Sequence, residues 1–197
     1  MATLYKVKTL TEPTELPVSL NEAKSQLVVE HTDDDLLIRR YMAAAVNHVE
    51  SATGLSLVRQ QKRLYLDRFA NEMRLPNGPV EEITQIQYVD TDGNTQTLSS
   101  AVYAFNNVEN YVRLAYGQTW PSVRVTENAV WIDYWAGYYD STTSPIDQTA
   151  KVPQAIKDAI YMIVADLYKN REATTDIQNY ENPAVNMMLG PFRVYVQ

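Results

Sequence analysis

Residues 33–54 read DDDLLIRRYMAAAVNHVESATG, and this stretch decides the architecture of the chain. Apolar residues recur in it at alternating spacings of four and three positions, at Ile38, Met42, Ala45, Val49 and Ala52. This spacing places them on one face of an α-helix. The three carboxylates before them suit the positive end of the helix dipole, and Thr32 is the expected N-cap. Gly54 can end a helix in a left-handed conformation, so the stretch predicts one long core helix.

Two further helices are predicted on either side of this stretch. Ser19 and Glu22 form a capping box, which begins a short helix that runs to about Leu27. Pro153 suits the first position of a third helix, because the amide donor that proline lacks is not needed there. This third helix is expected to end near Arg171. One face of it is apolar and broad enough to pack on the long helix, with Ile156, Ala159, Ile160, Ile163, Val164 and Leu167.

Between the helical segments, from Leu55 to Tyr139, the hydrophobic period changes to two and β-branched and aromatic residues dominate. The Asp92-Gly93 pair supplies the positive φ that a tight hairpin turn requires. Strands are expected at residues 61–66, 73–75, 83–89, 95–98, 102–105, 111–115 and 129–135. Short strands joined by tight turns indicate an antiparallel sheet or sandwich rather than a βαβ nucleotide fold.

The predicted fold class is therefore α+β, with a helical bundle core and an inserted antiparallel β-subdomain. Residues 1–54 would form the N-terminal helices of the core, residues 55–146 the β-subdomain, and residues 147–197 the core helix and a C-terminal tail. The tail, residues 183–196, is apolar and follows the polar residues 173–182. It has two interpretations, a last strand of the domain or a segment that docks on a neighbouring protein.

Composition and charge exclude several classes of protein. The 197 residues include 45% hydrophobic residues, which is enough for an ordinary core and argues against disorder. The chain has 24 acidic and 17 basic residues, a formal charge of −7, which argues against binding nucleic acid through a basic face. No apolar segment approaches the roughly 20 residues that cross a bilayer, and no signal peptide is apparent, so no membrane contact is expected.

Charge is spread evenly along the sequence. Residues 1–53 have five basic and eight acidic side chains (−3), residues 54–146 have seven and ten (−3), and residues 147–197 have five and six (−1). No segment therefore resembles a basic arm.

Catalytic and metal-binding patterns are missing from the sequence. It has no cysteine, which removes thiolate chemistry, and its two histidines, His31 and His48, do not form a zinc-binding spacing. None of the six glycines belongs to a phosphate-binding loop. Side chains at the consecutive positions 33–35 point about 100° apart on a helix and cannot converge on one ion. We expect no enzyme activity, no cofactor and no metal.

The chain is rich in aromatic residues, with 14 tyrosines and three tryptophans. One hypothesis is a carbohydrate-binding or glycan-cleaving module, in which rings stack on sugars and carboxylates such as Asp133 and Asp140 act on them. The favoured hypothesis is packing or subunit contact, because Trp131 and Trp135 lie four apart on one face of a strand with Asp133 between them. The candidates for subunit contact are Trp120, Trp135, Tyr138 and Tyr139.

Six groups of residues occur in an order that is characteristic of one family. They are PVSLNEAK (17–24), DDDLLI and VESATG (33–38 and 49–54), LPNGPV (75–80), YVDTDG (88–93), AGY (136–138), and VPQAIK with LYKNRE (152–157 and 167–172). In this order they resemble the head-tail connector (adaptor) proteins of long-tailed bacteriophages and prophages. The resemblance covers the chain from about Leu16 to Arg193.

This resemblance implies a non-enzymatic virion protein of the neck, assembled in the host cytoplasm. About twelve copies would form a ring beneath the portal, either in solution or by closure of monomers on the portal. The ring would contact the portal protein on one side and a stopper or tail-completion protein on the other, and would help to retain the packaged genome. Double-stranded DNA would pass through its centre without specific binding, which suits an acidic protein.

The resemblance also implies a site for the portal in the C-terminal segment, because adaptors of this family commonly engage the portal there. The matching residues are 183–196. The candidate anchors are Met187, Leu189, Phe192, Arg193 and Tyr195. The β-region is longer than in the smallest members of the family, which are nearly all helical.

Overall fold

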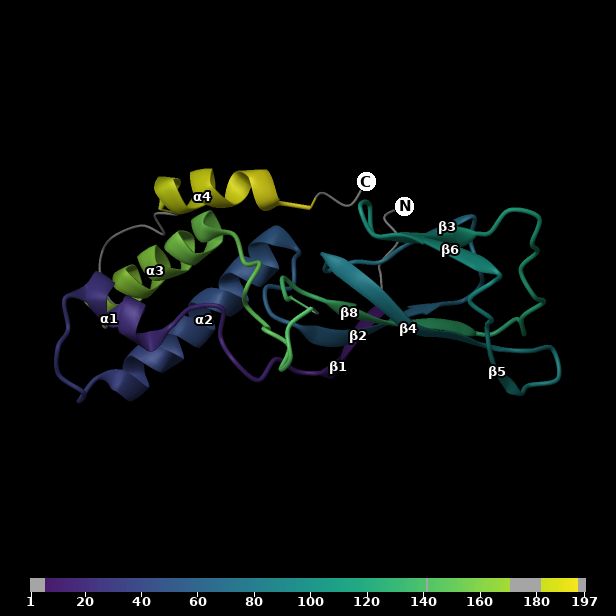
Figure 1. The fold of residues 1–197 in the computed structure, drawn as a ribbon, viewed down its shortest axis with the longest axis horizontal. Helices are drawn as coiled ribbons and strands as arrows, with labels where there is room; N and C mark the ends of the chain where they lie inside the picture. Colours follow the sequence, from purple (N-terminus) through teal and green to yellow (C-terminus); the bar gives the residue numbers. More distant parts are fainter. Residues whose placement is uncertain (1–5, 141, 171–181, 195–197) are drawn as a thin grey trace. The chain divides into compact units, whose positions relative to one another are not determined.

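The computed structural model describes residues 6–140, 142–170 and 182–194. Its helices are α1 (Leu20–Leu27), α2 (Asp35–Thr53), α3 (Gln154–Lys169) and α4 (Pro183–Leu189), followed by a short 3₁₀ turn, η1 (Gly190–Phe192). Its strands are β1 (Lys6–Thr11), β2 (Gln60–Leu66), β3 (Glu72–Arg74), β4 (Val80–Val89), β5 (Thr95–Thr97), β6 (Tyr103–Asn106), β7 (Tyr111–Leu114) and β8 (Val130–Ala136) (Figure 1). The α+β class predicted from the sequence is confirmed.

The chain forms two compact units. One, here called the sheet unit, contains residues 1–13 and 59–137, and the other, here called the helical unit, contains residues 14–58 and 138–196. Each unit has its own cluster of buried apolar side chains, and the two clusters share no residue.

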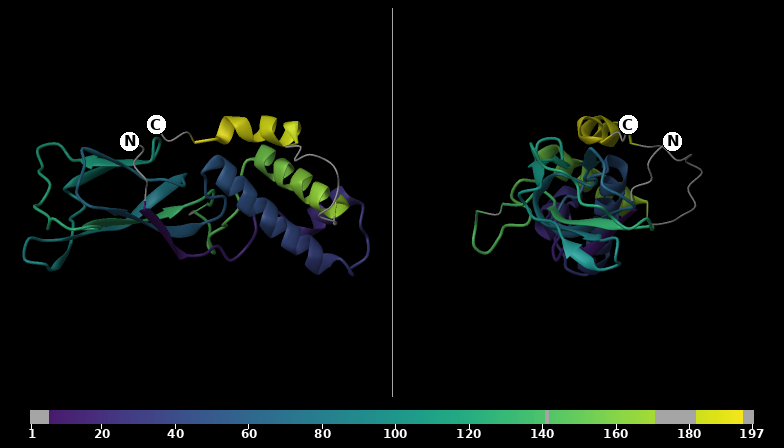
Figure 2. Two further views of the ribbon diagram at one scale, coloured as in Figure 1. Left: turned by 180° about the vertical axis from the view of Figure 1, so that it is seen from behind. Right: turned by 90° about the vertical axis from the view of Figure 1, so that its right-hand side faces the viewer.

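The helical unit is built around α2 and α3, with α1 and α4 packed against them (Figures 1 and 2). The predicted apolar stripe of α2 is buried, with Ile38, Met42, Ala45 and Val49 at most 1% exposed. Gly54 ends α2 as predicted, with φ +73°, and donates its N–H to the Glu50 carbonyl. The predicted N-cap at Thr32 is wrong. Asp34 occupies that position, because residues 32–35 first form a turn in which the Asp35 N–H bonds the Thr32 carbonyl.

The helix α1 begins with the predicted capping box and ends in an unusual way. The Glu22 N–H donates to Ser19 Oγ at 3.2 Å, and the Ser19 hydroxyl donates to the Glu22 carboxylate at 2.7 Å. The helix ends at Val28 in the left-handed conformation, with φ +57° and ψ +44°. Glycine or asparagine usually occupies such a position. A β-branched residue there carries a conformational cost of about 1–2 kcal/mol.

One hydrogen bond joins α1 to α3. The Tyr161 hydroxyl donates to the Glu22 carboxylate at 2.6 Å. This bond is the main reason that the pKa of Glu22 lies below its ordinary value. Burial, followed by the bond to Glu22, raises the pKa of Tyr161 to about 12. The phenol therefore stays protonated and acts as the donor.

The sheet unit contains two antiparallel sheets that enclose its apolar core. The larger has the strand order β1-β2-β8-β4-β5 and the smaller the order β3-β7-β6, and they lie one above the other in Figure 1. The fully buried side chains between them include Leu64, Ile86, Val112, Ile132 and Tyr134. The Tyr134 hydroxyl reaches the end of the core and donates to the Pro76 carbonyl at 2.8 Å.

All seven strands predicted from the sequence are present as β2 to β8. The predicted turn after β4 is also present, with Gly93 at φ +94°. The strand β1 was not predicted, and residues 6–11 pair with β2 instead of belonging to the N-terminal helices. The reason is physical: β1 is an edge strand whose side chains are half or fully exposed, so it lacks strong apolar alternation, and no turn pair such as Asp92-Gly93 marks it as part of a hairpin.

The two separate cores lead to a prediction about local stability. Ile132→Ala in the sheet unit or Ile160→Ala in the helical unit should lower the free energy of unfolding by about 2–5 kcal/mol, because each leaves a cavity at a fully buried position. Because the cores share no residue, amide hydrogen exchange should accelerate mainly in the unit that carries the substitution. Mass spectrometry of peptides from residues 60–66 and 154–169 measures this. Equal acceleration in both peptides for either variant would show that the units unfold together.

The bond between α1 and α3 predicts a pH-dependent contribution. Tyr161→Phe should lower the free energy of unfolding by about 1 kcal/mol at neutral pH, allowing for the partial exposure of the pair. Since the pKa of Glu22 is lowered in the folded state, the contribution is complete above the unfolded-state pKa and is lost as the pH falls through the folded-state pKa. Urea unfolding across the acid range measures the difference. Tyr116→Phe, at a fully exposed tyrosine, is the control, and a Tyr161→Phe deficit that persists in acid would contradict the assignment.

Candidate interaction surfaces

The described residues contain no group of three or more histidine, aspartate or glutamate side chains placed to hold a metal ion. Within the same ranges, no helix is both long and apolar enough to cross a membrane. The polar and aromatic candidates from the sequence are therefore considered as parts of interaction surfaces.

The larger sheet has one face turned away from the core of the sheet unit, here called the outer sheet face. Antiparallel register aligns its side chains in three rows across β1, β2, β8 and β4. The rows are Lys6–Tyr65–Trp131–Gln87, Lys8–Arg63–Asp133–Gln85 and Thr11–Gln61–Trp135–Glu82. Trp131, Asp133 and Trp135 therefore share a face, as the sequence predicted.

A charged pair occupies the middle of this face. Arg63 donates from Nε and Nη2 to the two carboxylate oxygens of Asp133, at 2.6 and 2.7 Å. Gln85 adds a third bond to Asp133 at 2.9 Å. The Asp133 side chain is 2% exposed, and its carboxylate raises the pKa of Arg63. Both oxygens of Asp133 are engaged, so this carboxylate is held in a structural pair rather than presented to a substrate.

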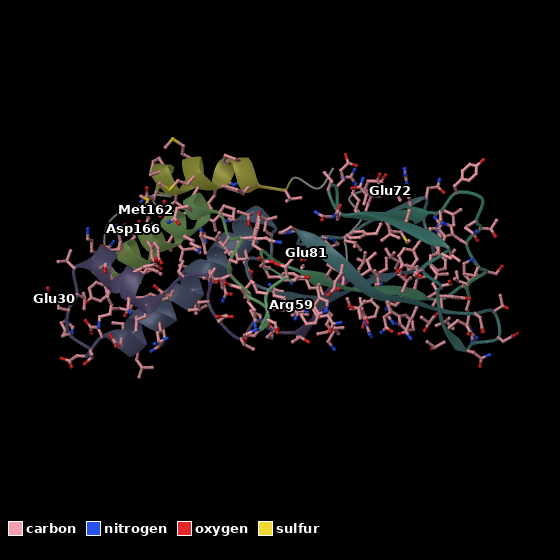
Figure 3. All side chains as sticks on the ribbon, viewed as in Figure 1. Glu30, Arg59, Glu72, Glu81, Met162 and Asp166 are labelled. Atoms are coloured by element: carbon pink, nitrogen blue, oxygen red, sulfur yellow. The ribbon has the colours of Figure 1, made fainter. Side chains whose placement is uncertain are left out.

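The two tryptophans on either side of the pair are also held in place. The guanidinium carbon of Arg59 lies 3.4 Å from the ring centroid of Trp135, a cation–π contact. The Trp131 indole N–H donates to Gln87 Oε1 at 3.0 Å. A ring that stacks on a sugar must expose its face, and Arg59 already covers one face of Trp135 (Arg59 is labelled in Figure 3). The geometry thus opposes the carbohydrate hypothesis at this cluster.

The other aromatic candidates for subunit contact do not join the outer sheet face. Trp120 stacks on Phe69 with ring centroids 4.7 Å apart and packs on the sheet core. Tyr138 is half-buried against the core of the helical unit, and Tyr139 is buried in the same unit. Of the four candidates, Trp135 alone lies on this face. Asp133 and Asp140, the carboxylates considered for glycan cleavage, belong to different units.

Residues 183–189 of the C-terminal segment form the helix α4, so the interpretation of the segment as a last strand is wrong. Asn182 caps α4 by accepting the Ala184 N–H at 3.1 Å, and Pro183 occupies the first turn. The Asn182 amide also donates to Asp166 of α3 at 3.1 Å. Asp166 is labelled on α3, next to α4, in Figure 3. A seven-residue apolar run is too short for periodicity to distinguish a buried helix from a strand.

The structure separates the portal-docking candidates by exposure. Leu189 is 1% exposed and helps to fix α4 in the core, whereas Met187 is 74% exposed. Phe192 packs partly against the core, and Arg193 donates to Asn186 Oδ1 at 2.7 Å. Tyr195 lies outside the described residues. Val194, which belongs to the same segment but was not singled out from the sequence as an anchor, has an exposed side chain.

Comparisons with known proteins agree on one assignment. A family model described as phage gp6-like head-tail connector protein matches residues 17–117, from just before α1 to just after β7. No curated protein sequence matches the chain significantly.

Three solved structures share the fold. The first is a chain in the virion of a native gene transfer agent (GTA) particle, with a TM-score of 0.75 and 19% identity over 96% of each chain. The second is a chain in the neck of an empty GTA particle computed with C6 symmetry, with a TM-score of 0.75 and 19% identity over 96% of this chain and 95% of that chain. The third is a chain in the neck of a native GTA particle computed with C12 symmetry, with a TM-score of 0.71 and 20% identity over 98% of this chain and 96% of that chain.

At this level of identity the solved structures establish the fold over nearly the whole chain. The family model covers just over half of the sequence, residues 17–117 of 197. With the fold and the family model in agreement, the chain belongs to the phage gp6-like head-tail connector family.

Proposed function

We propose that this protein is a neck subunit that forms a closed ring beneath the portal and joins the DNA-filled head to the tail or to a stopper protein. The observation that carries the proposal is membership of the head-tail connector family. The fold shared with chains from GTA necks computed with C6 and C12 symmetry supports a ring of identical or near-identical subunits. A closed ring requires a head-to-tail contact between two different surfaces of the same chain.

The two units have separate parts in this proposal. The helical unit is the core of the subunit, and residues 59–137 of the sheet unit are inserted in it, since the chain leaves the helical unit after Val58 and returns at Tyr138. The strand β1, which precedes the helical unit in the sequence, adds to the inserted sheet. The helical unit carries the portal-binding segment. The sheet unit supplies a rigid surface for contacts with neighbours.

The charge of the protein suits a channel that DNA passes through. The helical unit has 14 acidic and eight basic residues, a formal charge of −6, and the sheet unit has ten and nine, a charge of −1. A ring of such subunits repels the phosphate backbone, so that DNA can move through it without binding. Assembly in the host cytoplasm fits a chain without cysteine.

The C-terminal helix α4 is the proposed contact with the portal. Val185 and Leu189 are buried and hold α4 on the helical unit, while Met187 points its side chain away from the core. A methionine presented on a fixed helix can adapt its shape to an apolar pocket on a partner. Val194 extends the apolar surface beyond η1.

Met187→Asp tests the portal contact. The variant should keep the thermal stability of the wild type, because the side chain is exposed, and should bind the portal protein of the same particle at least about tenfold more weakly. Sedimentation with purified portal and negative-stain imaging of the complexes measure both the affinity and the ring.

Val125→Asp is the matched control, since it places the same charge at a fully exposed apolar residue of the sheet unit. Equal binding by the Met187 and Val125 variants would remove α4 from the portal contact. If wild-type protein does not bind the portal in any oligomeric state, the neck function itself is wrong.

A further inference from the structure

The corner between α1 and α2, residues 28–36, displays apolar and acidic side chains to solvent. Val28 is 86% exposed and Leu36 is 76% exposed. Glu30 and Asp33, which lie between them in the sequence, are also exposed. We call these four residues the acidic corner.

Hydrogen bonds hold the acidic corner in place, although the left-handed backbone of Val28 destabilises the isolated chain. Lys24 of α1 donates to the His31 carbonyl at 2.6 Å and to the Asp35 carboxylate at 2.7 Å, which ties the middle of the loop and the first residue of α2 to α1. Val28 keeps a left-handed backbone although its exposed side chain gains little from packing within the chain. Strained residues that persist without a local benefit concentrate at functional sites. A fixed loop also loses little entropy when it binds.

The outer sheet face has the complementary character. Lys6 and Lys8 are exposed along β1, next to Tyr65 and Arg63 in the register. Lys6 has one acidic neighbour, Glu127, with 3.8 Å between the charged atoms. Arg63 is paired with Asp133, so the two lysines provide the positive border of the face. The half-exposed rings of Tyr65 and Trp131 provide its apolar area, whereas Arg59 covers one face of Trp135.

We propose that the acidic corner of one subunit docks on the outer sheet face of the next copy of this chain in the ring. Glu30 and Asp33 face Lys6 and Lys8, and Val28 and Leu36 pack on the aromatic rings. The inference rests on the proposed neck function, and it deepens that function by naming the two surfaces that meet. The occupant is a second copy because the two surfaces differ and complement each other in charge and apolar character, as a head-to-tail ring contact requires.

Charge reversal on each surface tests the contact. The corner variant is Glu30→Lys/Asp33→Lys, and the sheet variant is Lys6→Glu/Lys8→Glu. When either variant is present alone, the two surfaces that meet at each subunit contact carry charges of the same sign. Each variant alone should associate about tenfold more weakly per contact and should not close a ring on the portal. The changed residues are exposed, so thermal melts should show that both variants fold.

Mixing the two variants gives the decisive result. In an equimolar mixture, the corner of the first variant, which is now basic, can dock on the sheet face of the second variant, which is now acidic. The next contact pairs the unchanged corner of the second variant with the unchanged sheet face of the first, so it keeps its natural charges. Rings on the portal should therefore return in the mixture, with the two variants alternating. Asp92→Lys/Glu109→Lys, which makes the same change in net charge as the corner variant at exposed positions outside both surfaces, should form rings alone.

Val28→Asn separates docking from folding. Asparagine tolerates the left-handed backbone better than valine, so the variant should melt at the same temperature as the wild type or higher. It should nevertheless associate more weakly, because an apolar contact is lost. If Val28 had only a structural role, its substitution would not weaken association while leaving the melting temperature unchanged or raised.

The outcomes distinguish the two proposals. If wild-type protein forms rings on the portal and either charge-reversed variant does so equally well alone, or the mixture fails to form them, the docking contact is overturned and the neck function stands. If the wild type itself forms no ring with its portal, both are overturned. Negative-stain imaging with sedimentation velocity provides these readouts.

Discussion

The antiparallel pairing of β2 with β8 is the constraint on which the architecture depends. Seven residue pairs join the first strand of the inserted segment to its last, from Gln60–Ala136 to Leu66–Val130. Paired strands lie about 5 Å apart, so the insertion begins and ends at nearly the same point. A long insertion can then be accommodated without separating α2 from α3, which still pack as neighbours in one core. The same pairing places Arg63 opposite Asp133 and so creates the outer sheet face.

The outer sheet face shows how a surface rich in possible catalytic groups can be structural. Asp133 accepts bonds from Arg63 and Gln85 at 2.6 to 2.9 Å, and the Trp131 indole donates to Gln87 at 3.0 Å, in each case across neighbouring strands. A buried carboxylate such as Asp133 needs these partners, because the loss of one would leave an uncompensated charge inside the protein. The result is a rigid surface in which Arg and Trp, the residues most enriched at the centres of protein interfaces, already have fixed positions.

The helical unit combines fixed and exposed elements in the same way. The helix α4 uses buried residues to hold its place and presents Met187 outward. The acidic corner uses Lys24 to fix a loop that presents Val28 and Leu36. In both places, buried contacts hold the backbone in position, and exposed side chains project from it. This arrangement suits a protein whose task is to hold neighbours rather than to transform a substrate.

The sequence by itself determined the α+β class, the positions of seven strands, the apolar face of α2 and the shared face of Trp131 and Trp135, because periodicity and turn residues act locally. The tertiary structure alone decided the features that depend on distant partners. The strand β1 and the helix α4 carry weak local patterns and are specified by what they pack against. Trp120 packs partly on the sheet core and Tyr139 is buried in the helical unit, and local sequence does not show either placement. The distribution of charge also depends on the tertiary structure. Formal charge is spread evenly along the chain, but it amounts to −6 in the helical unit and −1 in the sheet unit, because each unit is assembled from segments that are far apart in the sequence.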